Sequence, residues 1–391
     1  MTNKKTPHLT TQAVRVGLCS DKQHRALVPP IYLSATYALP GLNQKGEYDY
    51  SRTTNPTRNT LGRAIAELEH GHTGIITNTG MSAVLLVCQL LNPDDTVVIP
   101  HDCYGGTYRL FTHLAARGLF QLDIVDQNDA HALSRALSSA ENRPKLVWIE
   151  TPSNPLLRIY DIAAIAKQAK AAGALVAVDN TFLSPILQQP LGLGADIVVH
   201  SCTKFINGHS DVVAGAVVVR EQAIGETLSW WANCLGVTGS AMDSYWVMRS
   251  LRTLPARLRC HQENTEQIVE FLSHHPAIKT LYYPGLTTHP QHALAKTQQL
   301  GFGSLVSFEL VGDEAARQRF SEALQIFTLA QSLGGVESLI NHPASMTHAA
   351  MPDDAKITAG ISPALWRLSI GIEHPDDLIN DLRNALATVA P

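Results

Sequence analysis

The feature that most constrains the fold is a repeated alternation of short apolar runs with segments of helix length between residues 61 and 250. The apolar runs are rich in valine and isoleucine, and most precede a segment with helical spacing of its apolar residues. Strands and helices that alternate in this way predict an α/β domain, with a mostly parallel sheet covered on both faces. The predicted strands read TGIIT, DTVVIP, FQLDIVD, KLVWIE, ALVAVDN, ADIVVH and AGAVVVR.

The segments on either side of this domain differ from it in composition and in the pattern of apolar residues. Residues 1–60 are dense in Pro, Gly, Asn and Thr and show no helical period, so we expect an extended arm that packs on its own subunit or a neighbour. The C-terminal part begins with a long predicted helix, and it contains the strand candidates LVSFELV and LWRLSIGI with helices between and after them. The sequence therefore predicts an α/β domain over 61–250 and a smaller α+β domain over 251–391.

Charge and composition exclude several classes of protein. The formal net charge is -4 and no long basic run is present, which argues against nucleic acid and membrane surfaces as partners. No apolar stretch approaches the roughly 20 residues of a membrane span. The N-terminal lysines are not followed by the apolar region of a signal peptide, so we expect a cytoplasmic protein. No C-x-x-C pair occurs, and reduced thiols are expected at Cys19, Cys88, Cys103, Cys202, Cys234 and Cys260.

Polar residues follow several predicted strands, where open parallel sheets bind ligands. Gly80 and Met81 open a predicted helix, whose N–H groups and dipole suit an anion, although no P-loop motif is present and a plain turn is the alternative. Tyr104 could stack on a flat ligand or simply pack at a glycine turn. Asn154 could contact a ligand or serve as a turn residue.

The strongest candidates are Asp179 and Lys204. Asp179 ends an apolar strand, so it needs a cation or a strong donor, or else it caps the next helix. Lys204 follows another such strand, close to Ser201 and Thr203, whereas most lysines lie on solvated surfaces. Pyridoxal phosphate unites these groups, because its aldehyde condenses with a lysine amine and its pyridine nitrogen needs an acidic partner. The alternative, a non-catalytic nucleotide-binding module, leaves both residues unexplained.

Over nearly its whole length the sequence resembles the Cys/Met-metabolism family of pyridoxal-phosphate enzymes. The stretches that carry this resemblance are YDYSRTTNPTR, TNTGMSA, PHDCYGGTYRLF, ETPSNPLLRIYDI, VDNTFLSPILQQPLGLGADIVVHSCTKFINGHSDVVAG, SLGGVESLINHPASMTH and LWRLSIGIE. The resemblance implies fold type I, the aspartate-aminotransferase-like fold, with pyridoxal 5'-phosphate as cofactor. It also implies a homotetramer built from two dimers.

The resemblance implies roles for single residues in holding the cofactor. Lys204 would bond to it covalently, Asp179 would pair with the pyridine nitrogen, and Tyr104 would stack on the ring. Lys204 and Tyr104 would also carry protons. The remaining contacts would be Asn154 to the ring hydroxyl, Gly80, Met81, Ser201 and Thr203 to the phosphate, and Tyr50 and Arg52 to the phosphate in a neighbouring subunit.

The resemblance also implies the substrates. Arg367 would bind the substrate α-carboxylate with its two-pronged guanidinium, and Arg109 would meet the distal carboxylate of a succinyl group. Asp49 and Tyr50 would lie near the entrance, with Ser332 and Asn154 beside the substrate. The implied reaction, part of methionine biosynthesis, joins O-succinyl-L-homoserine and L-cysteine into L-cystathionine and succinate.

One departure from the family pattern keeps alternative activities open. Gln331 stands where many relatives have an acidic residue, and an amide gives no charge attraction to an ammonium group. Cystathionine or methionine γ-lyase and O-acyl-homoserine sulfhydrylase are therefore the alternative activities. No metal site is expected, because the histidines that invite one are scattered and suit loops or packing: His70, His72, His342 and His348.

Overall fold

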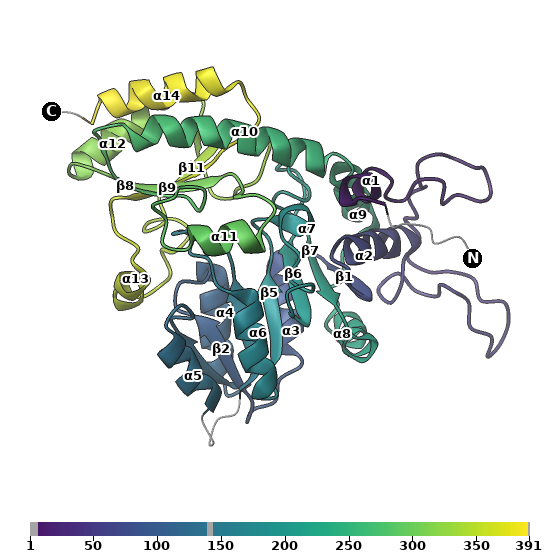
Figure 1. Cartoon of the computed structure of the whole chain (residues 1–391). Helices are drawn as coiled ribbons and strands as arrows, with labels where there is room; N and C mark the ends of the chain where they lie inside the picture. Colours follow the sequence, from purple (N-terminus) through teal and green to yellow (C-terminus); the bar gives the residue numbers. More distant parts are fainter. Residues whose placement is uncertain (1–6, 139–143, 390–391) are drawn as a thin grey trace.

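The computed structural model describes residues 7–138 and 144–389, which form two sheets with their helices (Figure 1). The larger sheet has the strand order β1-β7-β6-β5-β4-β2-β3. Strand β7 is antiparallel to both of its neighbours, and the pairings from β6 to β3 are all parallel. The strands are β1 (Thr73–Thr77), β2 (Thr96–Pro100), β3 (Gln121–Val125), β4 (Pro144–Glu150), β5 (Leu175–Asp179), β6 (Ile197–Ser201) and β7 (Gly215–Val219).

Helices cover both faces of this sheet because its strands are apolar on both sides. Val176 and Val178 of β5 pack in one core and Ala177 packs in the other. This confirms the predicted α/β architecture. One face is covered by α2 (Pro56–Leu68), α5 (Ala130–Ser138), α6 (Ile162–Ala171), α7 (Ser184–Leu187) and α9 (Ala241–Leu251), and the other by α3 (Gly80–Cys88), α4 (Gly105–Ala116) and α8 (Gln222–Leu235).

The smaller sheet has the order β10-β11-β12-β9-β8 and lies in the predicted α+β region. Its strands are β8 (Ile278–Tyr282), β9 (Leu305–Leu310), β10 (Thr328–Leu329), β11 (Leu339–Asn341) and β12 (Leu365–Ser369). Three helices cover one side of it, α10 (Leu254–Ser273), α12 (Glu314–Ala323) and α14 (Pro375–Ala387) (Figure 1). The short helices α11 (His292–Gln298) and α13 (Asp353–Ala359) complete this part.

The N-terminal segment differs in part from the expected extended arm. Helix α1 (Leu9–Val14) and the start of α2 at Pro56 both fall within residues 1–60, so the expectation is wrong at these two places. The sequence carried the signal for α2, since Asn55 accepts hydrogen bonds from two N–H groups and Pro56 opens the helix. Much of the remaining segment loops away from the body (Figure 1). Among the residues described, no helix combines the length and apolarity of a membrane span.

Candidate active site

A cavity of about 380 Å³ opens at the carboxyl ends of the parallel strands, where the sequence predicted a ligand. Residues from both sheets line it, and Glu150, Asp179 and Ser201 end the strands β4, β5 and β6. The site therefore depends on both parts of the chain. The lining residues are Thr79, Gly80, Met81, Val84, Tyr104, Thr107, Glu150, Pro152, Asn154, Asp179, Thr181, Phe182, Ser201, Thr203, Lys204, Val213, Gln331, Ser332, Leu333, Thr347 and Arg367.

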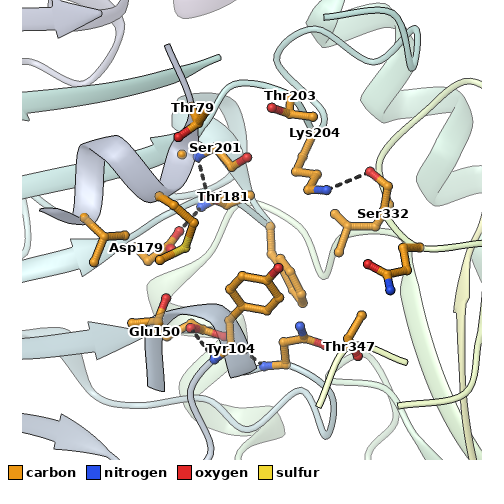
Figure 2. Close-up of a pocket in the computed structure, with 18 of the residues that line it drawn as sticks. Thr79, Tyr104, Glu150, Asp179, Thr181, Ser201, Thr203, Lys204, Ser332 and Thr347 are labelled. Carbon is orange, nitrogen blue, oxygen red and sulfur yellow. Dashed lines mark hydrogen bonds between the residues drawn. The ribbon is translucent and has the colours of Figure 1, made fainter. Parts of the chain in front are cut away.

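Lys204 lies three residues beyond the end of β6, and its Nζ donates a hydrogen bond to Ser332 Oγ over 2.7 Å (Figure 2). Burial, and then the positive charge of Arg367, lower the pKa of Lys204 from 10.5 to about 8. Ser332 holds this contact from a backbone position with φ of 93°, which is uncommon outside glycine and typical of functional sites. The amine is thus partly uncharged near neutral pH, as a nucleophile or base must be.

Arg367 is 2% exposed and projects from β12, the central strand of the smaller sheet. Its Nη1 donates to Asn154 Oδ1 over 2.7 Å, and its Nη2 donates to the backbone oxygen of Ser332 over 2.9 Å. Its Nε is buried without a partner among the described residues. Burial lowers the pKa of Arg367 to about 10, so the guanidinium remains a cation at neutral pH and suits a carboxylate ligand.

Asp179 and Glu150 are register partners on adjacent strands. Burial raises the pKa of both carboxyl groups, and for Glu150 the charge of Asp179 raises it further. Asp179 Oδ1 accepts a hydrogen bond from the backbone N–H of Thr181, and it does not cap α7, whose N-cap is Leu183. Within the part of the chain that the structure describes, no basic side chain forms an ion pair with Asp179. A cationic group of a ligand beside Asp179 would offset the burial of this carboxylate.

The N-terminus of α3 approaches the end of β6 very closely. A Cβ atom on Gly80 would lie 2.7 Å from Ser201 Cβ, so only glycine fits there without a shift. Thr79 caps α3 by accepting a hydrogen bond from the Ser82 N–H. This pairing of helix N–H groups with the Ser201 hydroxyl suits a phosphate. Thr203 also lines the cavity, but its hydroxyl is already hydrogen-bonded to the backbone of Ala214.

Tyr104 is the N-cap residue of α4, and its side chain is 38% exposed at the cavity. Its backbone N–H donates to Glu150 Oε2 over 2.9 Å (Figure 2), and the N–H of Asn154 donates to the other oxygen of Glu150 over 3.2 Å. Gly106 leaves room for the tyrosine ring, because a Cβ there would lie 2.5 Å from it. Glu150 thus fixes the two loops that carry Tyr104 and Asn154.

Some predicted site residues lie away from this cavity. Tyr50 is 47% exposed on the N-terminal segment, and Arg52 donates two hydrogen bonds to Asn233 of its own chain. Asp49 lies beside them in the same segment, and Arg109 is exposed on α4. None of the four is among the residues that line the cavity in the described chain. Their roles at the site remain predictions.

Other lining residues were not singled out from the sequence. The most important is Glu150, whose place at the end of KLVWIE gave the same signal as Asp179 did. Thr181 accepts a hydrogen bond from the Ser201 N–H over 2.8 Å (Figure 2) and so joins the ends of β5 and β6. Thr347 comes from a loop of the smaller part, and no local pattern predicts its contact with the cavity.

The donor set fits pyridoxal phosphate, with an uncompensated carboxylate, a lysine of lowered pKa, a flat aromatic side chain and a glycine cradle in one cavity. The described residues contain no cluster of three or more His, Cys, Asp or Glu that could hold a metal ion. The thiols of all six cysteines are free. Fold and site together define a fold-type I pyridoxal-phosphate enzyme.

Comparisons with known proteins narrow this class. The model of the Cys/Met metabolism PLP-dependent enzyme family matches residues 10–387, so the chain belongs to that family and pyridoxal 5'-phosphate is its cofactor. The chain is 54% identical to a cystathionine gamma-synthase of Escherichia coli strain K12, over 96% of each chain. It is 44% identical to a cystathionine gamma-lyase of Bacillus subtilis strain 168, over 97% of this chain and 99% of that one. A crystal structure of cystathionine gamma synthase from Xanthomonas oryzae pv. oryzae in complex with cystathionine has a TM-score of 0.97 and 55% identity, and the match covers 98% of this chain and 99% of that one.

Proposed function

We propose that the chain is a cystathionine γ-synthase that acts on O-succinyl-L-homoserine and L-cysteine in methionine biosynthesis. The bond between the γ-carbon and the ester oxygen breaks, a carbon–sulfur bond forms, and succinate and L-cystathionine are released. The observation that carries the chemistry is the Lys204 amine, of lowered pKa, in one cavity with Asp179 and Arg367. The choice among reactions is supported by the relatives of that name at 54% and 55% identity, against 44% for the lyase.

The chain's own residues supply most of the proposed mechanism. Bound pyridoxal phosphate supplies a sink for the electron pair left when a proton departs next to the amino group. Lys204 takes that proton at Nζ and later returns one, while the Ser332 hydroxyl, 2.7 Å away, keeps the amine in place. Asp179 in its charged form stabilises a proton on the ring nitrogen. Tyr104 would stack on the ring of the bound cofactor.

The substrate and cofactor contacts are proposed as follows. Arg367 binds the α-carboxylate through its guanidinium, next to Asn154 and Ser332, which already contact it. The phosphate is held by Gly80, Met81, Ser201 and Thr203, with Asn154 at the ring hydroxyl. Arg109 meets the distal succinyl carboxylate.

A second copy of the chain completes the proposed site. Residues 1–60 act as an arm toward a neighbouring subunit, residues 61–250 bind the cofactor, and residues 251–391 close the cavity. Tyr50 and Arg52 of the arm would contact the neighbour's phosphate, with Asp49 near the entrance. The arm exposes large apolar side chains, including Leu42 at 92%, which a partner copy would cover. We propose that two such dimers associate into a homotetramer.

A product assay tests the proposal. The purified holoenzyme is given O-succinyl-L-homoserine with and without L-cysteine, and separately L-cystathionine alone. We expect cystathionine and succinate only when both substrates are present, and no product from the Lys204→Ala variant. Release of 2-oxobutyrate from cystathionine alone would instead indicate a γ-lyase. This alternative remains because the cavity contains the neutral Gln331 where many relatives have an acidic residue.

A further inference from the structure

The turn that carries Lys204 is held from behind by a buried arginine of α10. Arg257 is 6% exposed, and its Nη1 donates to the backbone oxygen of Phe205 over 2.8 Å. Its Nη2 donates to the oxygens of Ile206 and Ser250 over 3.3 and 3.1 Å, and its Nε donates to Thr253 Oγ1 over 3.2 Å. Every nitrogen of the guanidinium is thus directed at a neutral acceptor.

Burying this cation costs free energy, because no carboxylate of the described residues offsets its charge. Across residues 7–138 and 144–389, Arg257 forms no ion pair with a carboxylate. Burial lowers the pKa of Arg257 to about 10, so it remains charged at neutral pH. A buried cation without an acid must be stabilised by dipoles that point at it.

The backbone after Lys204 supplies those dipoles. The Gly208 N–H donates to the oxygen of Lys204 over 2.7 Å, and the Asn207 N–H donates to the oxygen of Cys202 over 2.9 Å, so the chain forms a helical turn. The carbonyls of Phe205 and Ile206 end this turn and carry its partial negative charge. Gly208 has φ of 70°, and a Cβ there would overlap Arg257 Nη1. The turn after Lys204 and the guanidinium of Arg257 therefore pack closely against each other.

The same face of α10 also holds the strand that carries Arg367. His261, one turn beyond Arg257, contacts the oxygen of Ile370 through Nδ1 over 2.6 Å. Asn264 Nδ2 donates to the oxygen of Gly371 over 3.1 Å, just beyond β12. One helix face thus fixes the backbone next to Lys204 and the backbone next to Arg367.

We propose that Arg257 is a positioning residue, which sets the place of the Lys204 amine relative to the carboxylate-binding Arg367 by holding the carbonyls of the Lys204 turn. The inference rests on the proposed function for its effect on turnover, but its effect on attachment of the cofactor to Lys204 is independent of the substrate. Misplacement of a reacting group by about 1 Å is enough to cost roughly 100-fold in rate.

The test compares Arg257→Gln and Arg257→Lys with the matched control Arg259→Gln, whose arginine is on the same helix and 75% exposed. In the holoenzyme we expect Arg257→Gln to lower kcat by about 100-fold, with KM for both substrates within about 3-fold. The lysine variant keeps the positive charge but lacks the planar guanidinium with its several N–H donors, so it should recover part of the rate. The control should match the unaltered protein.

A second readout separates positioning from stability. The cofactor is removed, pyridoxal phosphate is added back well below the unfolding midpoint of each variant, and the rate of its attachment to Lys204 is followed by absorbance. Slower attachment in folded Arg257→Gln or Arg257→Lys supports the proposal. Attachment and kcat equal to those of the unaltered protein, with only a lower midpoint, overturn it.

If Arg257→Gln does not fold, the lysine variant decides, because its unchanged attachment rate and kcat would overturn the proposal. If the unaltered protein makes no cystathionine, the proposed function fails while the attachment rates still test the role of Arg257.

Discussion

The Lys204 amine shows how a single residue changes its chemistry on burial. An exposed lysine is almost fully charged near neutral pH, whereas burial and the neighbouring Arg367 lower the pKa of Lys204 to about 8. The uncharged amine can attack an aldehyde or take a proton, and the charged amine cannot. The pH dependence of cofactor attachment should therefore report this pKa.

We expect the attachment rate of pyridoxal phosphate to the cofactor-free protein to rise with pH and to level off with a midpoint near 8. Only the deprotonated amine reacts, so raising the pH increases the reactive fraction. In Arg367→Met the repelling charge is gone, so the pKa of Lys204 should move back toward 10.5 and the midpoint should rise. Stopped-flow absorbance across the pH range measures both midpoints. A midpoint that falls or stays fixed in the variant would contradict the electrostatic role of Arg367.

At the scale of elements, the close contact between α3 and β6 leaves no space for a methyl group at Gly80. We expect Gly80→Ala to separate the helix from Ser201 and to weaken cofactor binding by about 10-fold or more, since overpacking costs about 1–3 kcal/mol. Titration of the cofactor-free protein with pyridoxal phosphate measures this loss. The matched control is Gly192→Ala, where the nearest heavy atom would be 3.3 Å from the new Cβ and lies outside the cavity. Equal cofactor affinity in the two variants would show that the close approach is unimportant.

The elements also show how far the sequence could predict the structure. The strands of the large sheet were predictable because apolar residues on both faces form continuous runs. The start of α2 was missed because Asn55 and Pro56 lie in a segment that otherwise has turn composition. Lys204 and Asp179 could be found because both lie at or just beyond the carboxyl end of an apolar strand. The contacts of Thr347 and Ser332 with the cavity depend on how the smaller sheet packs, which no local pattern encodes.

At the scale of the whole molecule, the proposed role of the N-terminal arm makes the site a shared one. Mixing two defective variants tests this. Lys204→Ala lacks the reactive amine, and Arg52→Ala lacks the proposed phosphate contact. In a mixed dimer one site combines the intact Lys204 of one copy with the intact Arg52 of the other. After joint unfolding and refolding, we expect cystathionine synthesis to recover to about a quarter of that of the unaltered protein.

The control for this mixture pairs Arg52→Ala with a chain that carries both substitutions, which should restore nothing. Equal failure of the two mixtures would mean that Arg52 acts in its own subunit, if at all, and the arm would need another explanation.

The position of Arg367 in the middle of the smaller sheet has a consequence for how the enzyme matures. Of all the residues that line the cavity, it is the last to be synthesised, and its strand pairs with β9 and β11 on either side. The proposed carboxylate-binding arginine therefore joins the cavity only after β12 has been synthesised and has paired with both neighbouring strands.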